Sequence, residues 1–325
     1  MNIYVIHLAE GFLAFLSNLG LHRNRLESLY GEQDVDGQYY HQRIVRGINH
    51  FDNFYHDLSE KENFLEFGTG SACIDLVIAY LLGFEKIITC DINDHISLNY
   101  LKSINLFEEH LDKLSQNFSI KKKVLLKRFD KIRDINNKNT FFDRLNITFL
   151  KFNELEDFNI DKIDVWYSIS NLQRIPLENL LQYSKIATKA LKRNGIAYHK
   201  VDCNDIHSQP HYPFSSNKIH RLDYLKYQDS VWKLLNNKKY GCQNRIRYPQ
   251  YMTLFEGLSM SPSNLQLYVD QEDIDYVEKR MSLPASFKYM TPKQIAVTHF
   301  KVILKKEPKG TMNKTYFRTS ELDNM

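Results

Sequence analysis

Between residues 63 and 202, short apolar runs alternate with stretches of helical periodicity. NFLEFG (63–68) and KIITCDI (86–92) flank ACIDLVIAYLLGF (72–84), which has helical spacing. Further strand-like runs are ITFLKF (147–152), IDVWYSIS (163–170) and GIAYHKVD (195–202). Strands that alternate with helices are typical of a parallel sheet covered by helices on both faces. The sequence therefore predicts a doubly wound α/β fold.

The late part of the chain departs from this alternation. LENLLQYSKIATKALKRNG (177–195) has helical spacing and places Gly195 where a C-cap is expected. After the polar stretch 203–250 come a helix at YMTLFEGL and strand-like runs at NLQLYVD and AVTHFKVILKK. Two strands this late in the chain predict an antiparallel edge on the parallel sheet, with the last strand antiparallel.

A length of 325 residues is enough for one large domain with additions. Residues 61–306 form the predicted main domain, with a substrate-side insertion at 203–255. Residues 1–60 are expected to form a helical cap, and residues 307–325 a flexible tail. The polar stretch 94–142 is expected to hold two helices.

Charge and cysteine usage bear on partners and location. The chain has 43 Lys and Arg against 39 Asp and Glu, a net charge of +4, which is less than nucleic-acid binders usually carry. The four cysteines form no CxxC pair, which favours reduced thiols and a cytoplasmic protein. His7 and Glu10 interrupt the apolar stretch 3–19, so a helix that covers the core is favoured over a membrane-surface helix. We expect no nucleic-acid partner and no membrane span.

The stretch LEFGTGSAC (65–73) is the clearest candidate for a ligand-binding loop. Glycines between a strand and a helix let backbone amides approach a ligand closely. A dinucleotide loop reads GxGxxG, and its third glycine is Cys73 here. Glu66, just before the glycines, would repel a pyrophosphate but suits a ligand with an ammonium group. The loop therefore favours S-adenosylmethionine, which has an amino-acid end and no phosphate, over NAD.

Other polar residues end the neighbouring strands. Asp91 ends the second strand, where an acid can accept hydrogen bonds from ribose hydroxyls. Asn153 follows the third strand, where an amide can meet the adenine amino group, and Ser168 is near the end of the fourth. The expected cofactor-binding residues are Glu66, Gly68, Thr69, Gly70, Asp91, Ile92, Asn153 and Ser168.

Through LEFGTGSA, the acid in ITCDIN, the strand IDVWYSIS and the LKRNG turn, residues 62–202 resemble the class I S-adenosylmethionine-dependent methyltransferases. The resemblance implies a Rossmann-like methyltransferase fold with that cofactor. In this family the loop often reads acid-x-G-x-G-x-G, and Ala72 stands where the last glycine is common.

A closer resemblance extends to about residue 306. It is to bacterial methyltransferase-domain proteins associated with glycan biosynthesis, through SISNLQRIP (168–176), VDCNDIH (201–207), LDYLKYQDSVWKLL (222–235) and GCQNRIRYPQY (241–251). Gln173 and Arg174 replace an EH pair of those proteins, and Ile206 splits their DH pair.

The segment after the fifth strand concentrates the candidate catalytic residues. A hydroxyl acceptor has a high pKa, so methyl transfer to it needs a base or a metal near the oxygen. His207 and Asp205 are the expected bases, and Asp202 is expected to bind substrate. A divalent metal held by these three residues is a less favoured alternative, and no metal is predicted.

Arg245 and Arg247 lie two residues apart, so on a strand-like segment they would share a face. Such a pair suits the recognition of a phosphate or carboxylate on the substrate. The alternative is that these arginines hold the insertion onto the core.

Together these features predict methyl transfer from S-adenosylmethionine to a small-molecule or glycan acceptor, with a hydroxyl oxygen as the expected target. SNLQ (170–173), after the fourth strand, is not the Asn/Asp-Pro-Pro-aromatic motif of base amino-methylation. Two alternatives remain open, an NAD-linked sugar oxidoreductase and a methyltransferase-fold protein that binds without catalysis. The sequence names neither the acceptor nor the oligomeric state.

Overall fold

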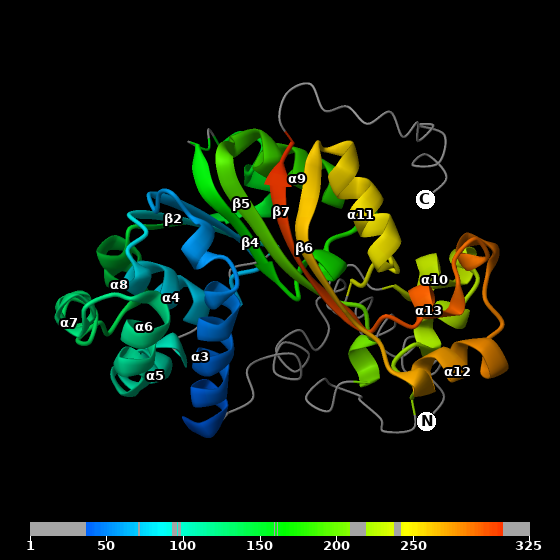
Figure 1. Ribbon diagram of the computed structural model, residues 1–325, viewed down its shortest axis with the longest axis horizontal. Coiled ribbons are helices and arrows are strands. Elements are labelled where there is room, and N and C mark those ends of the chain that lie inside the picture. The colour runs from blue at the N-terminus through cyan, green and yellow to red at the C-terminus, as the bar shows by residue number, and fades with distance from the viewer. Residues whose placement is uncertain are drawn as a thin grey trace, which may run out of the picture.

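The strands form one mixed sheet of seven strands among the described residues. The computed structural model describes residues 37–70, 72–92, 96, 99–158, 160, 162–208, 219–236 and 242–307. The strands are β1 (Asn63–Phe67), β2 (Lys86–Asp91), β3 (Ile147–Lys151), β4 (Ile163–Ile169), β5 (Leu191–Asp202), β6 (Met260–Tyr268) and β7 (His299–Lys306). Their order is β3-β2-β1-β4-β5-β7-β6, and β7 is antiparallel to both of its neighbours (Figure 1).

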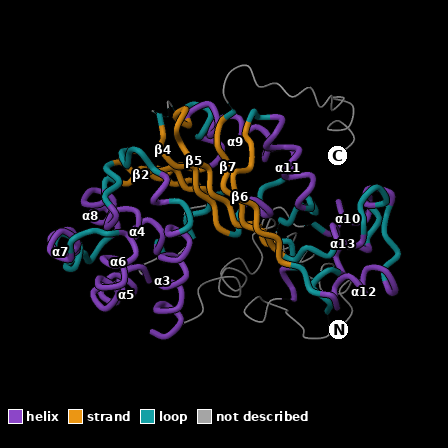
Figure 2. The backbone as a smooth tube through the Cα atoms, in the orientation of Figure 1, coloured by secondary structure: helices purple, strands orange, loops and turns teal. Residues whose placement is uncertain are grey.

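Helices cover both faces of this sheet, as Figure 2 shows. One face packs against α3 (Gly37–Asp52), α4 (Ile74–Leu82), α5 (Asn99–Leu106), α6 (Leu111–Phe118), α7 (Lys122–Phe129) and α8 (Lys138–Leu145). The other packs against α9 (Leu177–Ala190) and α11 (Tyr248–Gly257). The central strand β4 is buried along all but its last residue, as expected of a parallel strand covered on both sides. The predicted doubly wound fold with an antiparallel last strand is confirmed.

A third apolar cluster lies at one end of β6 and β7. It joins α10 (Asp229–Leu235), from the predicted insertion, to α12 (Gln271–Arg280) and α13 (Pro292–Ile295), which lie between β6 and β7 in the chain. Figure 1 shows these three helices grouped together, away from α3 to α8. Trp232 of α10 shares this cluster with Val277 of α12 and Ile295 of α13. The described part of the predicted insertion therefore packs against the segment that follows β6.

The predicted C-cap at Gly195 is wrong. The helix α9 ends at Ala190, and the next residue, Leu191, is already extended and begins β5. A Cβ on Gly195 would lie 3.0 Å from the Asp164 carbonyl oxygen, where the pairing of β4 with β5 shifts register. The absence of a Cβ at Gly195 therefore lets β4 and β5 approach each other closely at a bulge.

The predicted pair of helices in 94–142 is also wrong. The stretch holds α5, α6, α7 and most of α8, and Ser119 in the left-handed region ends α6. Residues 1–36, which include the apolar stretch 3–19, lie outside the described residues. So does the predicted tail beyond Glu307. Of the predicted cap, α3 and the short turn after it are described. No helix in the described part of the chain is long and apolar enough to cross a membrane.

His199 of β5 is enclosed by aromatic rings. Its ring centroid lies 4.4 Å from that of Trp166 and 5.4 Å from that of Phe255. Neither ring nitrogen has a hydrogen-bond partner in the described structure. Burial lowers the pKa of His199 to about 3.

Replacing His199 with Phe is expected to reduce the decrease in the free energy of unfolding as the pH falls. The folded-state pKa lies below that of an unfolded histidine, about 6.5, so the unfolded chain takes up the proton first as pH falls. Stability is therefore lost below that pH. Between pH 7 and pH 5 this histidine contributes about 2 kcal/mol of the loss.

The check is the free energy of urea unfolding of both proteins at pH 7 and pH 5. Asp75 acts in the opposite direction because burial raises its pKa to about 6, but it does so in both proteins and cancels from the comparison. An identical pH dependence in wild type and His199→Phe would contradict the expectation.

Candidate functional site

The predicted glycine loop lies where the carboxyl ends of β1 and β2 meet. Gly68 has a φ of +93° and Gly70 a φ of +62°, so both adopt the left-handed region that favours glycine. The Gly68 amide donates to the Cys90 carbonyl oxygen at 2.8 Å, and the Gly70 amide lies 3.5 Å from Asp91 Oδ2. The structure thus brings the loop and the predicted ribose acid together.

The two glycines have different surroundings. A Cβ on Gly68 would lie 2.4 Å from the side chain of Asn171, which follows β4. Gly68 therefore lets the end of β4 pack against the loop. No described atom lies within 4 Å of a Cβ built on Gly70. Among the described atoms, the loop is closely packed at its first glycine and open at its second, where a ligand can approach the backbone.

Glu66 lies buried beside this loop. Its Oε2 accepts a hydrogen bond from the Thr89 hydroxyl at 2.8 Å, and that hydroxyl lies 2.6 Å from the Thr69 hydroxyl. Burial, with the nearby charges of Asp75 and Asp91 adding to it, raises the pKa of Glu66 well above its usual range. The chain Glu66, Thr89 and Thr69 ties β1, β2 and the loop together around one carboxyl group.

The other predicted cofactor residues are placed differently. Asp91 Oδ1 accepts the backbone N–H of Ile92 at 2.7 Å, and the Ile92 side chain is 42% exposed beside it. Asn153 is exposed in the short helical turn that follows β3. Ser168 is fully buried in β4, and its hydroxyl has no hydrogen-bond partner in the described structure.

The segment after β5 is held by hydrogen bonds. Asp202 Oδ1 accepts the backbone N–H of Asn204 at 3.0 Å, and the Asp205 amide donates to the Arg221 carbonyl oxygen at 2.7 Å. The Asp205 side chain is buried. His207 lies in a short helical turn, and its side chain is outside what the structure describes. No group of three or more His, Cys, Asp or Glu in the described residues is arranged to hold a metal ion.

Arg247 is completely buried in the fold. Its guanidinium donates to the Cys203 carbonyl oxygen at 2.8 Å and to the Tyr224 hydroxyl at 3.0 Å. It also donates to the carbonyl oxygens of Ile295 and Val297. These contacts fit the alternative reading, an arginine that holds the insertion onto the core, rather than an anion clamp.

Arg245 points to a different set of partners. It donates to the Tyr227 carbonyl oxygen, pairs with Asp229, and lies over the rings of Trp232 and Phe287. The two guanidinium groups therefore do not converge on one ligand.

Sequence reasoning missed two members of the loop's surroundings, Thr89 and Asp75. Thr89 lies in the apolar strand KIITCD and Asp75 in the apolar helix IDLVIAYLL. A lone polar residue in an apolar run is the signal that would have found them, because such a group needs a partner when it is buried.

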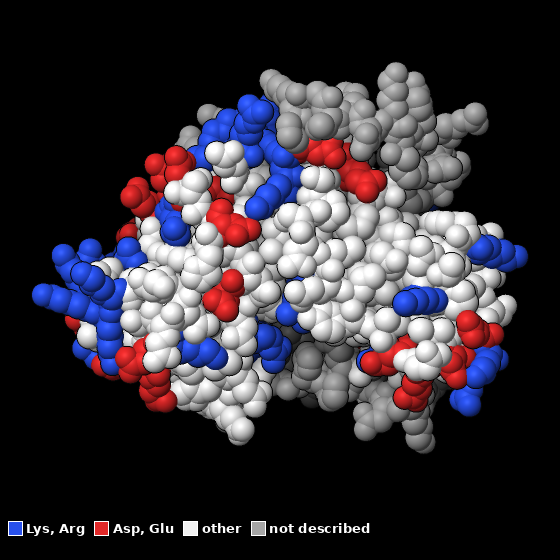
Figure 3. Space-filling model, in the orientation of Figure 1, with Lys and Arg blue, Asp and Glu red and all other residues white. Residues whose placement is uncertain are grey.

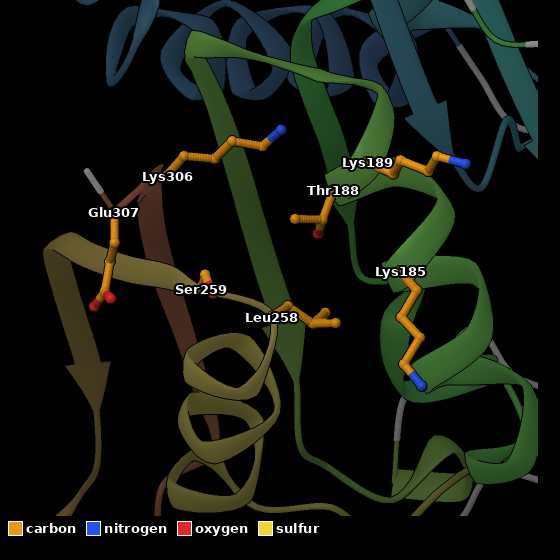
Figure 4. Close-up of a pocket in the computed structure, with 7 residues that line it drawn as sticks. All are labelled: Lys185, Thr188, Lys189, Leu258, Ser259, Lys306 and Glu307. Atoms are coloured by element: carbon orange, nitrogen blue, oxygen red, sulfur yellow. The ribbon is translucent and has the colours of Figure 1, made fainter. Parts of the chain in front are cut away.

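Two open pockets lie at the opposite ends of the strands from this loop. They have volumes of about 320 and 440 Å³ and share Lys306 and Glu307. Figure 4 shows that Lys185, Lys189 and Lys306 of the smaller pocket point in different directions. Because these lysines do not converge, the pockets are weaker candidates for a specific site than the loop.

No family model matches this sequence, and no curated protein matches it. Among solved structures, an S-adenosylmethionine-dependent methyltransferase from Clostridium acetobutylicum is similar at 10% identity, covering 88% of this chain and 99% of that chain with a TM-score of 0.40. The magnesium protoporphyrin IX methyltransferase from Synechocystis, with bound S-adenosylhomocysteine, is similar at 9% identity (90% and 97% covered, TM-score 0.43). Geranyl diphosphate methyltransferase in complex with S-adenosylmethionine is similar at 11% identity (86% and 95% covered, TM-score 0.41). These identities and scores are too low to support a statement about substrate.

Proposed function

We propose that this protein transfers a methyl group from S-adenosylmethionine to a small-molecule or glycan acceptor. The observation that carries the proposal is the glycine loop, open at Gly70 and flanked by Glu66 and Asp91. In open α/β sheets, ligands bind outside the carboxyl ends of the strands, which is where this loop lies.

The residues around the loop suit an aminoacyl nucleoside. Asp91 would accept hydrogen bonds from the ribose hydroxyls, and its Oδ2 lies 3.5 Å from the Gly70 amide. Glu66 would pair with the ammonium group at the amino-acid end of the ligand. Burial raises the pKa of Glu66, and a nearby cation would favour its ionised form, which is the form that attracts an ammonium group. Exposed Asn153, in the helical turn after β3, is the proposed partner of the adenine amino group.

The charge of the same residues disfavours a dinucleotide. Glu66, Asp75 and Asp91 influence one another electrostatically around the loop. A pyrophosphate placed there would meet carboxyl groups in a partly buried setting, where repulsion is stronger than in water. This argues against the NAD-linked oxidoreductase.

Bound at the loop, S-adenosylmethionine would supply an electrophilic methyl group on its sulfonium. The chain's own part is to hold the acceptor in line with that carbon and to accept the proton that the acceptor loses. For a hydroxyl acceptor, we propose Asp205 or His207 as the base and Asp202 as a substrate contact. All three belong to the end of β5 or to the segment that follows it, on the same edge of the sheet as the loop.

Calorimetric titration of the full chain tests the proposal. We expect binding heat with S-adenosylmethionine and with S-adenosylhomocysteine, and none with NAD under the same conditions. Both adenosyl ligands should also raise the unfolding temperature, because they bind the folded state. Absence of binding by both would refute the proposed function, and binding of NAD alone would support the oxidoreductase.

A further inference from the structure

Four cationic residues of α3, β5 and β7 lie close enough that three of them act through their charge on the fourth, Lys200. We call Arg43, Arg46, Lys200 and Lys301 the basic cluster. Lys200 and Lys301 are directly opposite each other in the antiparallel pair of β5 and β7, so their side chains lie on the same face. Arg43 and Arg46 belong to α3, which covers that face.

The contact of α3 with this face is direct. His50 of α3 lies 2.9 Å, from Nδ1, from the hydroxyl of Tyr198, which is two residues before Lys200 in β5. Burial is the largest cause that lowers the pKa of Lys200, and the charges of Arg46, Lys301 and Arg43 lower it further. Figure 3 shows Lys and Arg side chains in the recess between α3 and the strands β6 and β7.

This arrangement is costly without an anion. Like charges directly opposite each other on neighbouring strands destabilise a sheet, and partial burial strengthens the repulsion. No carboxylate of the described residues forms an ion pair with Arg46, Lys200 or Lys301. Three carboxyl groups interact with the cluster through their charge, Asp75 with both arginines, Glu66 with Arg43 and Asp202 with Lys200. The four cations still outnumber these acids.

The cluster lies near the edge of the sheet that carries the glycine loop. Lys200 is two residues from the end of β5, and Lys301 is two residues from the start of β7. The charge of Arg43 also acts on Glu66, the carboxyl group beside the loop. The Nε2 atom of buried His50 has no hydrogen-bond partner in the described residues.

We propose that the basic cluster binds an anionic group of the methyl acceptor, a phosphate or a carboxylate. Both groups accept charge-assisted hydrogen bonds from guanidinium and ammonium donors, and either would relieve the repulsion between Lys200 and Lys301. The anion would anchor the acceptor beside the cofactor loop, on the side of α3. This inference rests on the proposed function and narrows its acceptor to an anionic molecule.

The test uses the full chain saturated with S-adenosylhomocysteine. It is titrated at fixed ionic strength with pyrophosphate and, separately, with succinate. Tighter binding of pyrophosphate would identify a phosphate site, and tighter binding of succinate a carboxylate site. Lys301→Gln should weaken binding of the preferred anion about tenfold, since it removes one charged donor.

Lys305→Gln is the matched control and should leave anion binding unchanged. Lys305 lies on the same face of β7, where it pairs with Asp57 instead. If Lys301→Gln does not fold, Arg46→Gln, an exposed position on α3, replaces it. Failure of both anions to bind, or equal binding by wild type and Lys301→Gln, would overturn the inference.

Two further outcomes separate this inference from the proposed function. If Lys301→Gln weakens S-adenosylhomocysteine itself, the cluster holds the cofactor's carboxylate and the acceptor assignment is wrong. If S-adenosylhomocysteine fails to bind even wild type, the proposed function fails. Titration of the unloaded chain and of Lys301→Gln with the two anions then still decides whether the cluster is an anion site.

Discussion

Asp91→Ala is expected to weaken the binding of S-adenosylmethionine by about 3 kcal/mol, roughly 150-fold in Kd. The reason is the loss of the two proposed charge-assisted hydrogen bonds from the ribose hydroxyls to the Asp91 carboxylate, which lies beside the Gly70 amide. Calorimetric titration with S-adenosylhomocysteine measures the effect without turnover.

Two further variants make this result interpretable. Asp91→Asn keeps one acceptor oxygen and should show an intermediate loss. Asp112→Ala removes an exposed acid of α6 that pairs with Lys122 and should bind as wild type does. Equal affinity of wild type and a folded Asp91→Ala protein would refute the ribose assignment.

Arg247→Met is expected to lower the free energy of unfolding by about 4 kcal/mol. Methionine keeps much of the apolar stem but leaves the carbonyl oxygens of Ile295 and Val297 without their buried donor, while that of Cys203 keeps the Tyr224 hydroxyl. The cost is large because unsatisfied buried acceptors lose water without gaining a partner. Urea unfolding followed by circular dichroism measures it.

Arg245→Met is the matched comparison, two residues earlier in the chain. Its loss should be smaller, about 2 kcal/mol, because it gives up one backbone acceptor, a mostly exposed Asp229 partner and its ring contacts. A larger loss from Arg245→Met than from Arg247→Met would show that the buried network is not what holds the insertion.

The sequence pattern predicted most of the sheet because β1, β2, β4 and β5 contain short apolar runs that end in, or are followed by, a glycine, an acid or a serine. It failed at LKRNG, where Lys, Arg and Asn before Gly195 resemble a helix end. The bulge that begins β5 at Leu191 depends on the pairing with β4, which periodicity does not contain. The helices α5 to α8 are each only eight residues long, so residue spacing did not show where one ends and the next begins.

The residues of the candidate site also differ in how far the sequence could predict them. The loop and Asp91 could be predicted because turn chemistry and strand ends are local properties of the sequence. The direction of Arg247 could not, since its backbone acceptors lie 44 to 50 residues away in the sequence. The pairing of Lys200 with Lys301 was equally hidden, because it depends on strand register across a hundred residues.

The place of β7 in the sheet has a consequence for synthesis on the ribosome. This strand is the last of the described strands in the chain, yet it lies between β5 and β6. Until residues 299–306 emerge, β5 and β6 each present an unpaired edge, and such edges template association between nascent chains. The sheet can therefore be completed only after nearly all of the described chain has been made. Before that point the nascent chain has the greatest need of chaperones that shield the unpaired strand edges.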